Sequence, residues 1–124
     1  MARHGIQDRS FAFACEIVAL HREISREAGT VRALAGQLLR SGTSIGANLE
    51  EAHAAHGRAD FVAKCSIALK EARETKYWLR LLSATRLVSS DRVSELIDES
   101  SEIVAILTTI RRKSRESTDG GNDK

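Results

Sequence analysis

The chain has 124 residues, is 42% hydrophobic but only 4% aromatic, and contains no proline. This length suits one domain, and a core built from aliphatic and small side chains favours the packing of helix on helix. The formal net charge of +2 is too small to indicate a nucleic-acid-binding protein by itself. No apolar run approaches the roughly 20 residues of a membrane span, and the amino-terminal MARHGIQDRS lacks the apolar stretch of a signal peptide. We therefore expect a cytoplasmic protein that does not contact a membrane.

The first helix is expected over residues 8–27. Its core-facing stripe has the three- and four-residue spacing of a bundle helix: Phe13, Ile17, Leu20 and Ile24. Three flanking apolar residues are expected to widen this face: Phe11, Ala14 and Val18. Asp8 or Ser10 is predicted to cap the start, and Gly29 to end the helix.

The second and third helices are expected over residues 31–55 and 59–85, with Thr30 as the cap of the second and Gly57 between them. Their core-facing positions alternate in steps of three and four: Val31, Leu34, Leu38, Ser41, Ile45, Asn48 and Ala52, then Phe61, Cys65, Ala68, Ala72, Thr75, Leu79 and Leu82. The second helix also contains Gly36, Gly42 and Gly46. Each glycine costs ~1 kcal/mol relative to alanine inside a helix. We expect close approach of a neighbouring backbone to offset that cost.

A fourth helix is expected over residues 90–114, followed by a disordered polar tail over 115–124. Its core-facing positions repeat the same spacing: Val93, Leu96, Ser100, Ile103, Leu107 and Ile110. The two cysteines, Cys15 and Cys65, lie among apolar neighbours and are predicted to be reduced core residues. Four helices with short connections predict one all-α domain over 1–124, an antiparallel up-down-up-down four-helix bundle.

One stretch resembles a known family. The run from Arg40 to Ala52, RSGTSIGANLEEA, is similar to the SIxxN(I/L)xE signature of the bacterial four-helix-bundle proteins, also called 23S rRNA intervening-sequence proteins. Residues 59–61 and 66–82 resemble that family's third helix. Many members read NIAEG at the end of the signature, whereas Glu50 and Ala52 replace its alanine and glycine here.

The resemblance implies an antiparallel four-helix bundle that assembles into a ring-like homo-oligomer, commonly a homopentamer. It also implies association with nucleic acid or the ribosome, and no enzymatic activity. Fold likeness alone does not transfer function. Neither a Ser–His–Asp order nor a phosphate loop nor a dinucleotide fingerprint occurs in the sequence, which also argues against an enzyme.

Basic residues on the third and fourth helices are the candidate nucleic-acid contacts: Lys70, Arg73, Lys76, Arg80, Arg111 and Arg112. Lysine and arginine neutralise backbone phosphates without reading sequence, although solvated helix faces explain these charges about as well. Tyr77 and Trp78 are adjacent and point in different directions on a helix. Binding of single strands by stacked bases is therefore poorly supported by the sequence.

A polar cluster repeats along the second helix: Ser41, Ser44, Asn48 and Glu51. It is either a binding pocket, which Lys70, Arg73 and Glu74 could face, or a hydrogen-bonded network that fixes helix register, which we favour. A metal site at His53 and His56 is a weak candidate, because the second histidine lies where the helix ends.

The sequence thus predicts a non-enzymatic homo-oligomer without a cofactor that acts as an adaptor for RNA or DNA, most plausibly structured RNA. The alternative is a scaffold that binds an unidentified protein encoded nearby.

Overall fold

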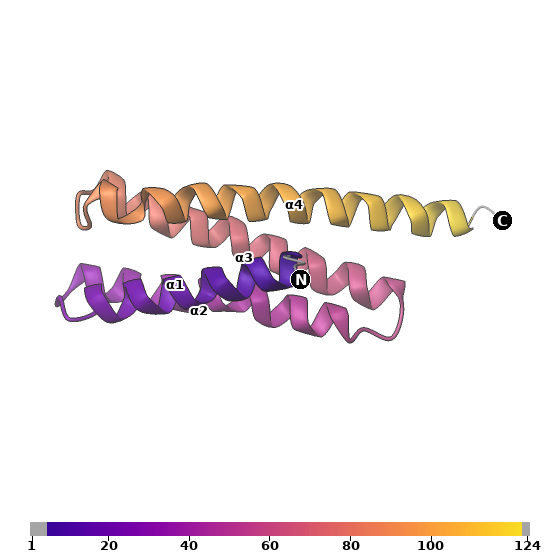
Figure 1. Ribbon diagram of the computed structural model, residues 1–124, viewed down its shortest axis with the longest axis horizontal. Helices are drawn as coiled ribbons and strands as arrows, with labels where there is room; N and C mark the ends of the chain where they lie inside the picture. The colour runs from indigo at the N-terminus through magenta and orange to yellow at the C-terminus, as the bar shows by residue number, and fades with distance from the viewer. Residues whose placement is uncertain (1–4, 123–124) are drawn as a thin grey trace.

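The computed structural model describes residues 5–122, and the side chains of residues 5–116, as four α-helices without a strand in that range. The helices are α1 (Ile6–Ile24), α2 (Thr30–His53), α3 (Arg58–Ala84) and α4 (Ser90–Asn122). The turns after α1 and α3 lie at one end of the molecule and the turn after α2 at the other (Figure 1). Helix α2 packs against α1 and α3, α3 packs against α4, and α1 meets α4 less extensively. The all-α prediction is confirmed.

The core follows the predicted spacing. On α1, all four residues of the predicted stripe are buried. On α2 and α3 the buried members of the predicted set are Val31, Leu38, Ser41, Ile45, Ala52, Cys65, Ala68, Ala72, Thr75, Leu79 and Leu82, and Ala35, Leu49 and Leu69 are buried in addition. On α4, Val93, Leu96, Ser100, Ile103 and Leu107 are buried. Leu34, Asn48, Phe61 and Ile110 are half-buried. Alternating steps of three and four residues thus locate the face of each helix that meets its neighbours.

Two of the three α2 glycines lie against α1. A Cβ atom built on Gly42 would lie 2.8 Å from Cγ2 of Ile17, closer than carbon atoms approach without a shift. A Cβ on Gly46 would lie 3.6 Å from the Ser10 carbonyl oxygen, in ordinary contact. Nothing lies within 4 Å of a Cβ on Gly36, which is exposed. The predicted approach of a neighbouring backbone therefore holds for Gly46, whereas Gly42 meets the Ile17 side chain instead and Gly36 meets neither.

The predicted width of the α1 core face is wrong for Phe11 and Val18, whereas the third flanking residue, Ala14, is half-buried. Phe11 is 68% exposed and Val18 is 41% exposed, and Cys15, which was predicted to lie in the core, is also exposed. The physical reason is the helical period of about 3.6 residues per turn, which is about 100° per residue. Phe11 lies about 200° from Phe13 and Val18 about 100° from Ile17, so both side chains project from the side of α1 away from the core stripe.

The predicted caps of α1 and α2 differ from the structure. Thr30, the predicted cap of the second helix, is the first residue of α2, which follows Gly29 and has no side-chain cap. Helix α1 begins at Ile6 after Gly5, without a side-chain cap, so neither Asp8 nor Ser10 caps it. It ends at Ile24, and Gly29, with a φ of 71°, precedes the first residue of α2 instead of following the last of α1. A left-handed φ of this kind favours glycine.

Helix α4 continues to Asn122, so the prediction of a disordered tail is wrong for residues 115–122. Arg112 and Glu116, which are one helical turn apart, form an ion pair at 3.8 Å that supports the helix beyond its predicted end at residue 114. The end of α4 extends beyond the turn between α2 and α3 (Figure 1). Residues 123 and 124 lie outside the described part of the chain.

Candidate nucleic-acid interface

One face of α3 carries a row of exposed cationic side chains. Lys70, Arg73 and Arg80 are all exposed, and Tyr77 lies between the two arginines with 53% of its surface exposed. Steps of three, four and three residues place these four side chains on one side of the helix. They are on the outside because the buried residues of α3 occupy the opposite side. Lys76, the fourth α3 candidate, is half-buried and belongs less clearly to this row.

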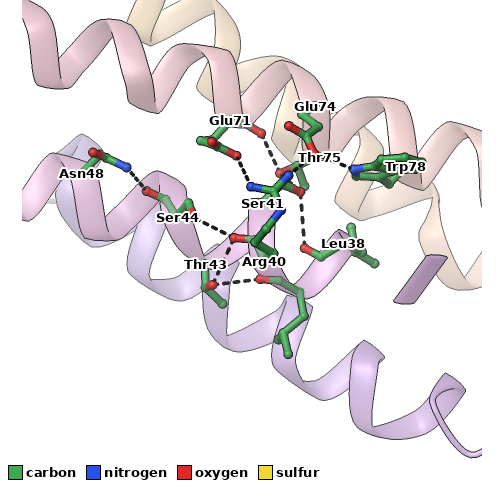
Figure 2. A network of polar contacts seen from close by, with 11 residues as sticks. Leu38, Arg40, Ser41, Thr43, Ser44, Asn48, Glu71, Glu74, Thr75 and Trp78 are labelled. Carbon is green, nitrogen blue, oxygen red and sulfur yellow. Dashed lines mark hydrogen bonds and ion pairs between the residues drawn. The ribbon is translucent and has the colours of Figure 1, made fainter. Parts of the chain in front are cut away.

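The acidic residues of the same stretch turn towards α2. Arg40 of α2 forms ion pairs with Glu71, at 3.2 Å, and with Glu74 (Figure 2). Glu71 is only 13% exposed, so its charge is largely withdrawn from solvent. Arg40 offsets one of these two negative charges, and Lys70 of the row also interacts with Glu74. Four cations (Arg40, Lys70, Arg73 and Arg80) against two carboxylates leave this stretch with a net positive charge.

Glu74 also binds the adjacent tryptophan. The indole Nε1–H of Trp78 donates a hydrogen bond of 3.0 Å to the Glu74 carboxylate. This bond, followed by the hydrogen bond from Arg40, lowers the pKa of Glu74, while burial works against the shift. The hydrogen bond with Glu74 in turn raises the pKa of Arg40. The Trp78 ring meets the Tyr77 ring at a centroid distance of 5.1 Å and an angle of 72°. A chain of contacts therefore runs from Arg40 to Tyr77.

Beneath this surface, α2 and α3 are joined by a buried hydroxyl pair. Thr75 Oγ1 lies 2.9 Å from Ser41 Oγ and 2.7 Å from the Glu71 carbonyl oxygen, and both side chains are fully buried (Figure 2). The bond between the two hydroxyls forms at one register of the helices. A shift of one helix along the other would break it and leave each hydroxyl with a carbonyl oxygen of its own helix alone, Leu38 for Ser41 at 3.4 Å and Glu71 for Thr75.

The rest of the predicted polar cluster makes local contacts. Ser44 Oγ donates to the Arg40 carbonyl oxygen at 2.7 Å, and Asn48 Nδ2 donates to the Ser44 carbonyl oxygen at 2.9 Å. Glu51 is exposed. Only one of the three α3 residues that were proposed to face this cluster points towards α2. Glu74 pairs with Arg40, whereas Lys70 and Arg73 are exposed to solvent. The geometry favours the register interpretation over a binding pocket.

Sequence reasoning missed Arg40 as the cation that pairs with the α3 carboxylates. A signal for it exists in hindsight. If Ser41 and Thr75 face each other, Arg40 lies beside the turn that contains Glu71 and Glu74. The spacing within each helix was readable, but the alignment of one helix along the other was not.

The two candidates on α4 lie apart from the α3 row. Arg112 is 60% exposed and Arg111 is half-buried. The nearby Ser114 lines a hollow with Gly57 and Arg58 at the start of α3. From Arg58 to Arg80 the helix rises about 33 Å at 1.5 Å per residue. The structure therefore separates the six predicted basic residues into an α3 group and an α4 group.

The two histidines of the weak metal candidate do not share a helix face. Helix α2 ends at His53, before His56. His53 lines a hollow with the buried Cys65, whereas His56 lines a different one beside Arg58. Among residues 5–116, whose side chains are described, no three His, Cys, Asp or Glu side chains are grouped so that they could hold a metal ion.

The face between α1 and α4 has the opposite charge. A cleft of about 430 Å³ there is lined by Ala12, Phe13 and Leu96 and by four carboxylates, Asp8, Glu16, Glu95 and Glu99. Arg9 crosses it to bind Glu99 at 2.7 Å. One cation among four carboxylates leaves this face unfavourable to phosphate.

Across the described helices, none combines the length and apolarity that a membrane span requires.

Comparison with known proteins places the chain. The sequence profile described as 23S rRNA-intervening sequence protein matches residues 3–109. Among solved structures, the chain is similar to a protein of unknown function from the S23 ribosomal protein family of Bacteroides thetaiotaomicron, with 42% identity and a TM-score of 0.80. The match covers 86% of this chain and 98% of that one. No curated protein matches. The chain therefore belongs to the 23S rRNA-intervening sequence protein family.

Proposed function

We propose that this protein is a non-enzymatic adaptor that binds RNA through the outer face of α3. The observation that carries the proposal is the exposed row of Lys70, Arg73 and Arg80, whose neighbouring carboxylates are paired with Arg40. Exposed cations attract phosphate only to the extent that nearby anions leave their charge uncompensated. Arg40 offsets one of the two carboxylates, so the cations of this stretch outnumber the anions by two.

The distribution of charge supports a single face. The carboxylates of the α1–α4 cleft disfavour a polyanion on that side. A formal net charge of +2 therefore understates the potential over α3, because much of the negative charge is located elsewhere. A polyanion approaching the molecule is attracted to the α3 face and repelled by the cleft.

RNA is favoured over DNA because of the family to which the chain belongs, whose name refers to sequences within 23S rRNA. We place the protein in the cytoplasm, where such RNA is made. We further propose that the four helices form an antiparallel up-down-up-down bundle that assembles into a ring, commonly of five copies. A ring repeats the α3 face, so a weak contact gains affinity through multivalency.

The test is binding of a fluorescein-labelled RNA stem-loop, measured by anisotropy over a range of salt concentrations. Electrostatic binding falls steeply as salt rises, with a slope of about −0.7 per phosphate neutralised on single strands. Replacing the three exposed cations, Lys70→Gln, Arg73→Gln and Arg80→Gln, is expected to weaken binding and to reduce that slope by about 2.

A matched control changes three other exposed arginines: Arg22→Gln, Arg26→Gln and Arg32→Gln. Both triple variants lower the formal net charge by three, from +2 to −1. If the two variants lose affinity equally, binding depends on net charge and not on the α3 face. If the wild-type protein binds no RNA at low salt and micromolar concentration, the proposal is refuted.

A second candidate function, docking of a protein, is favoured by the exposed apolar residues of α1. Phe11 and Val18 lie two turns apart and are 68% and 41% exposed. The occupant of this face is either another copy of the chain or a separate protein. Light-scattering mass of the wild type and of the Phe11→Ser, Val18→Ser variant distinguishes them. A lower mass for the variant than for the wild type indicates that this face mediates self-assembly. An equal mass indicates that the face binds a separate protein.

A further inference from the structure

Tyr77 lies at the centre of the basic α3 face with much of its ring uncovered. Its exposed fraction is 53%, the highest among the large hydrophobic side chains of α2, α3 and the described part of α4. One turn before it on the helix is Arg73, and nearly one turn after it is Arg80, both exposed. An aromatic ring between two cations is the combination that single-stranded nucleic acids use, with bases on the ring and phosphates on the cations.

The Tyr77 ring is held in place from one side. Its contact with Trp78 is nearly perpendicular, at 72° and a centroid distance of 5.1 Å, so the two rings meet by an edge and do not cover each other as stacked rings would. Trp78 is in turn fixed by its hydrogen bond to Glu74, which pairs with Arg40. A ring held in this way loses little conformational freedom when a base stacks on it.

The sequence alone argued against stacking, because Tyr77 and Trp78 point in different directions. The structure assigns them different tasks. Trp78 is half-buried and bonded to Glu74, and Tyr77 alone faces solvent among the cations. Two aromatic rings that point in different directions cannot both stack on the bases of one strand. A single ring between two arginines can stack on one base without a second ring.

We propose, building on the proposed function, that Tyr77 stacks an unpaired base of the bound RNA while Arg73 and Arg80 contact the phosphates on either side. The ligand is then an RNA with an unpaired segment, such as a loop or a bulge, and not a continuous duplex. From Lys70 to Arg80 the helix rises about 15 Å, which spans about four nucleotides at the 3.4 Å rise of a stacked strand. In a continuous duplex the bases are already stacked on one another, and the ring has no base to accept.

The test compares two labelled RNAs, a stem-loop and a blunt duplex with the same number of phosphates. The wild-type protein is expected to bind the stem-loop about tenfold more tightly, within the range that base stacking on an aromatic side chain contributes. Tyr77→Leu removes the ring but keeps an apolar side chain and a good helix former. It is expected to lose this preference with an unchanged salt slope, and Tyr77→Phe is expected to keep it.

The control is Phe11→Leu, which removes another exposed aromatic ring. Phe11 is 68% exposed on α1 but has Gln7, Asp8, Ala14 and Cys15 one turn away, and no cation. Phe11→Leu is expected to keep the preference for the stem-loop over the duplex, a ratio that does not depend on whether the Phe11 face contributes to assembly. Circular dichroism and light scattering, recorded for every variant, show that fold and assembly are retained.

The outcomes separate the two proposals. Equal binding of the stem-loop and the duplex by the wild type, or a preference that survives in Tyr77→Leu, overturns stacking while salt-dependent binding preserves the proposed function. Absence of binding to either RNA at low salt overturns both. A reduced salt slope in Tyr77→Leu also contradicts stacking, since a neutral ring neutralises no phosphate.

Discussion

Three alanine substitutions within α2 test the packing of α1 on α2. Gly36→Ala, Gly42→Ala and Gly46→Ala each gain the same intrinsic helix propensity, about 1 kcal/mol. They differ in what the new methyl group meets. Gly36 has nothing within 4 Å, Gly46 has ordinary contacts at 3.6 to 3.9 Å, and Gly42 has Ile17 atoms at 2.8, 3.0 and 3.3 Å.

The clash at Gly42 cannot be relieved by moving a flexible side-chain end. The three atoms it meets are Cγ2, Cγ1 and Cβ of Ile17, all close to the backbone of a β-branched residue that is fully buried. Relief requires α1 to move away from α2, and overpacking of this kind costs about 1–3 kcal/mol. Subtracting the helix-propensity gain leaves Gly42→Ala destabilised by about 1 kcal/mol. Gly36→Ala, with no clash, is stabilised by about 1 kcal/mol, and Gly46→Ala falls between them.

The assay is urea unfolding followed by circular dichroism, at one protein concentration because the proposed assembly would make stability concentration-dependent. A second background sharpens the result. In Ile17→Ala the Cγ atoms are absent, so adding Gly42→Ala is expected to stabilise that variant, with a coupling free energy of about 1–3 kcal/mol. If Gly42→Ala stabilises the wild-type protein as much as Gly36→Ala does, the close approach of α1 to α2 is refuted.

Three further predictions concern buried and paired groups. Thr75→Val removes one of the two buried hydroxyls and is expected to destabilise the protein by about 1–2 kcal/mol. Adding Ser41→Ala is expected to recover part of this loss, which a double-mutant cycle of urea unfolding measures. Strictly additive losses would contradict a bond shared by the two hydroxyls. The lowered pKa of Glu74 contributes stability above its ordinary value of 4.5 that is lost as pH falls through the folded-state pKa. Trp78→Phe should make acid unfolding less pH-dependent, by a few tenths of a kcal/mol for so partly exposed a group, and an unchanged pH profile would exclude the indole as the cause. Because burial raises the pKa of the Cys65 thiol whereas Cys15 is exposed, a thiol reagent should label Cys15 in the native protein and both residues only in denaturant.

The fold was predictable from the sequence because each helix repeats its core positions without interruption. Ile17, Leu38, Leu79 and Leu107, one from each helix, are fully buried at the predicted spacing. This spacing reports the direction in which a helix faces its neighbours. The same spacing places other positions outside the core. Phe11 was wrongly placed there, because it lies about 200° from Phe13 and therefore on the opposite side of α1.

The candidate site was predictable only in part, because it depends on how two helices are aligned with each other. The cations of α3 are visible in the sequence, but their value as a phosphate-binding face depends on where Glu71 and Glu74 turn. That direction is set by the alignment of α3 along α2, which the hydroxyls of Ser41 and Thr75 fix. Relative alignment is a property of two segments distant in the chain, and no local pattern encodes it.

This dependence explains how the stretch that resembles the family signature can serve function without touching a ligand. Arg40 opens that stretch, and its contacts go to α3 rather than to solvent alone. By pairing with Glu71 and Glu74 it offsets one of the two negative charges beside the basic row. Through Glu74 it fixes Trp78, against which Tyr77 rests. The buried pair of Ser41 and Thr75 holds these groups in alignment. The second helix therefore determines the charge of the α3 face and supports its aromatic ring, while α3 supplies the residues that would contact RNA.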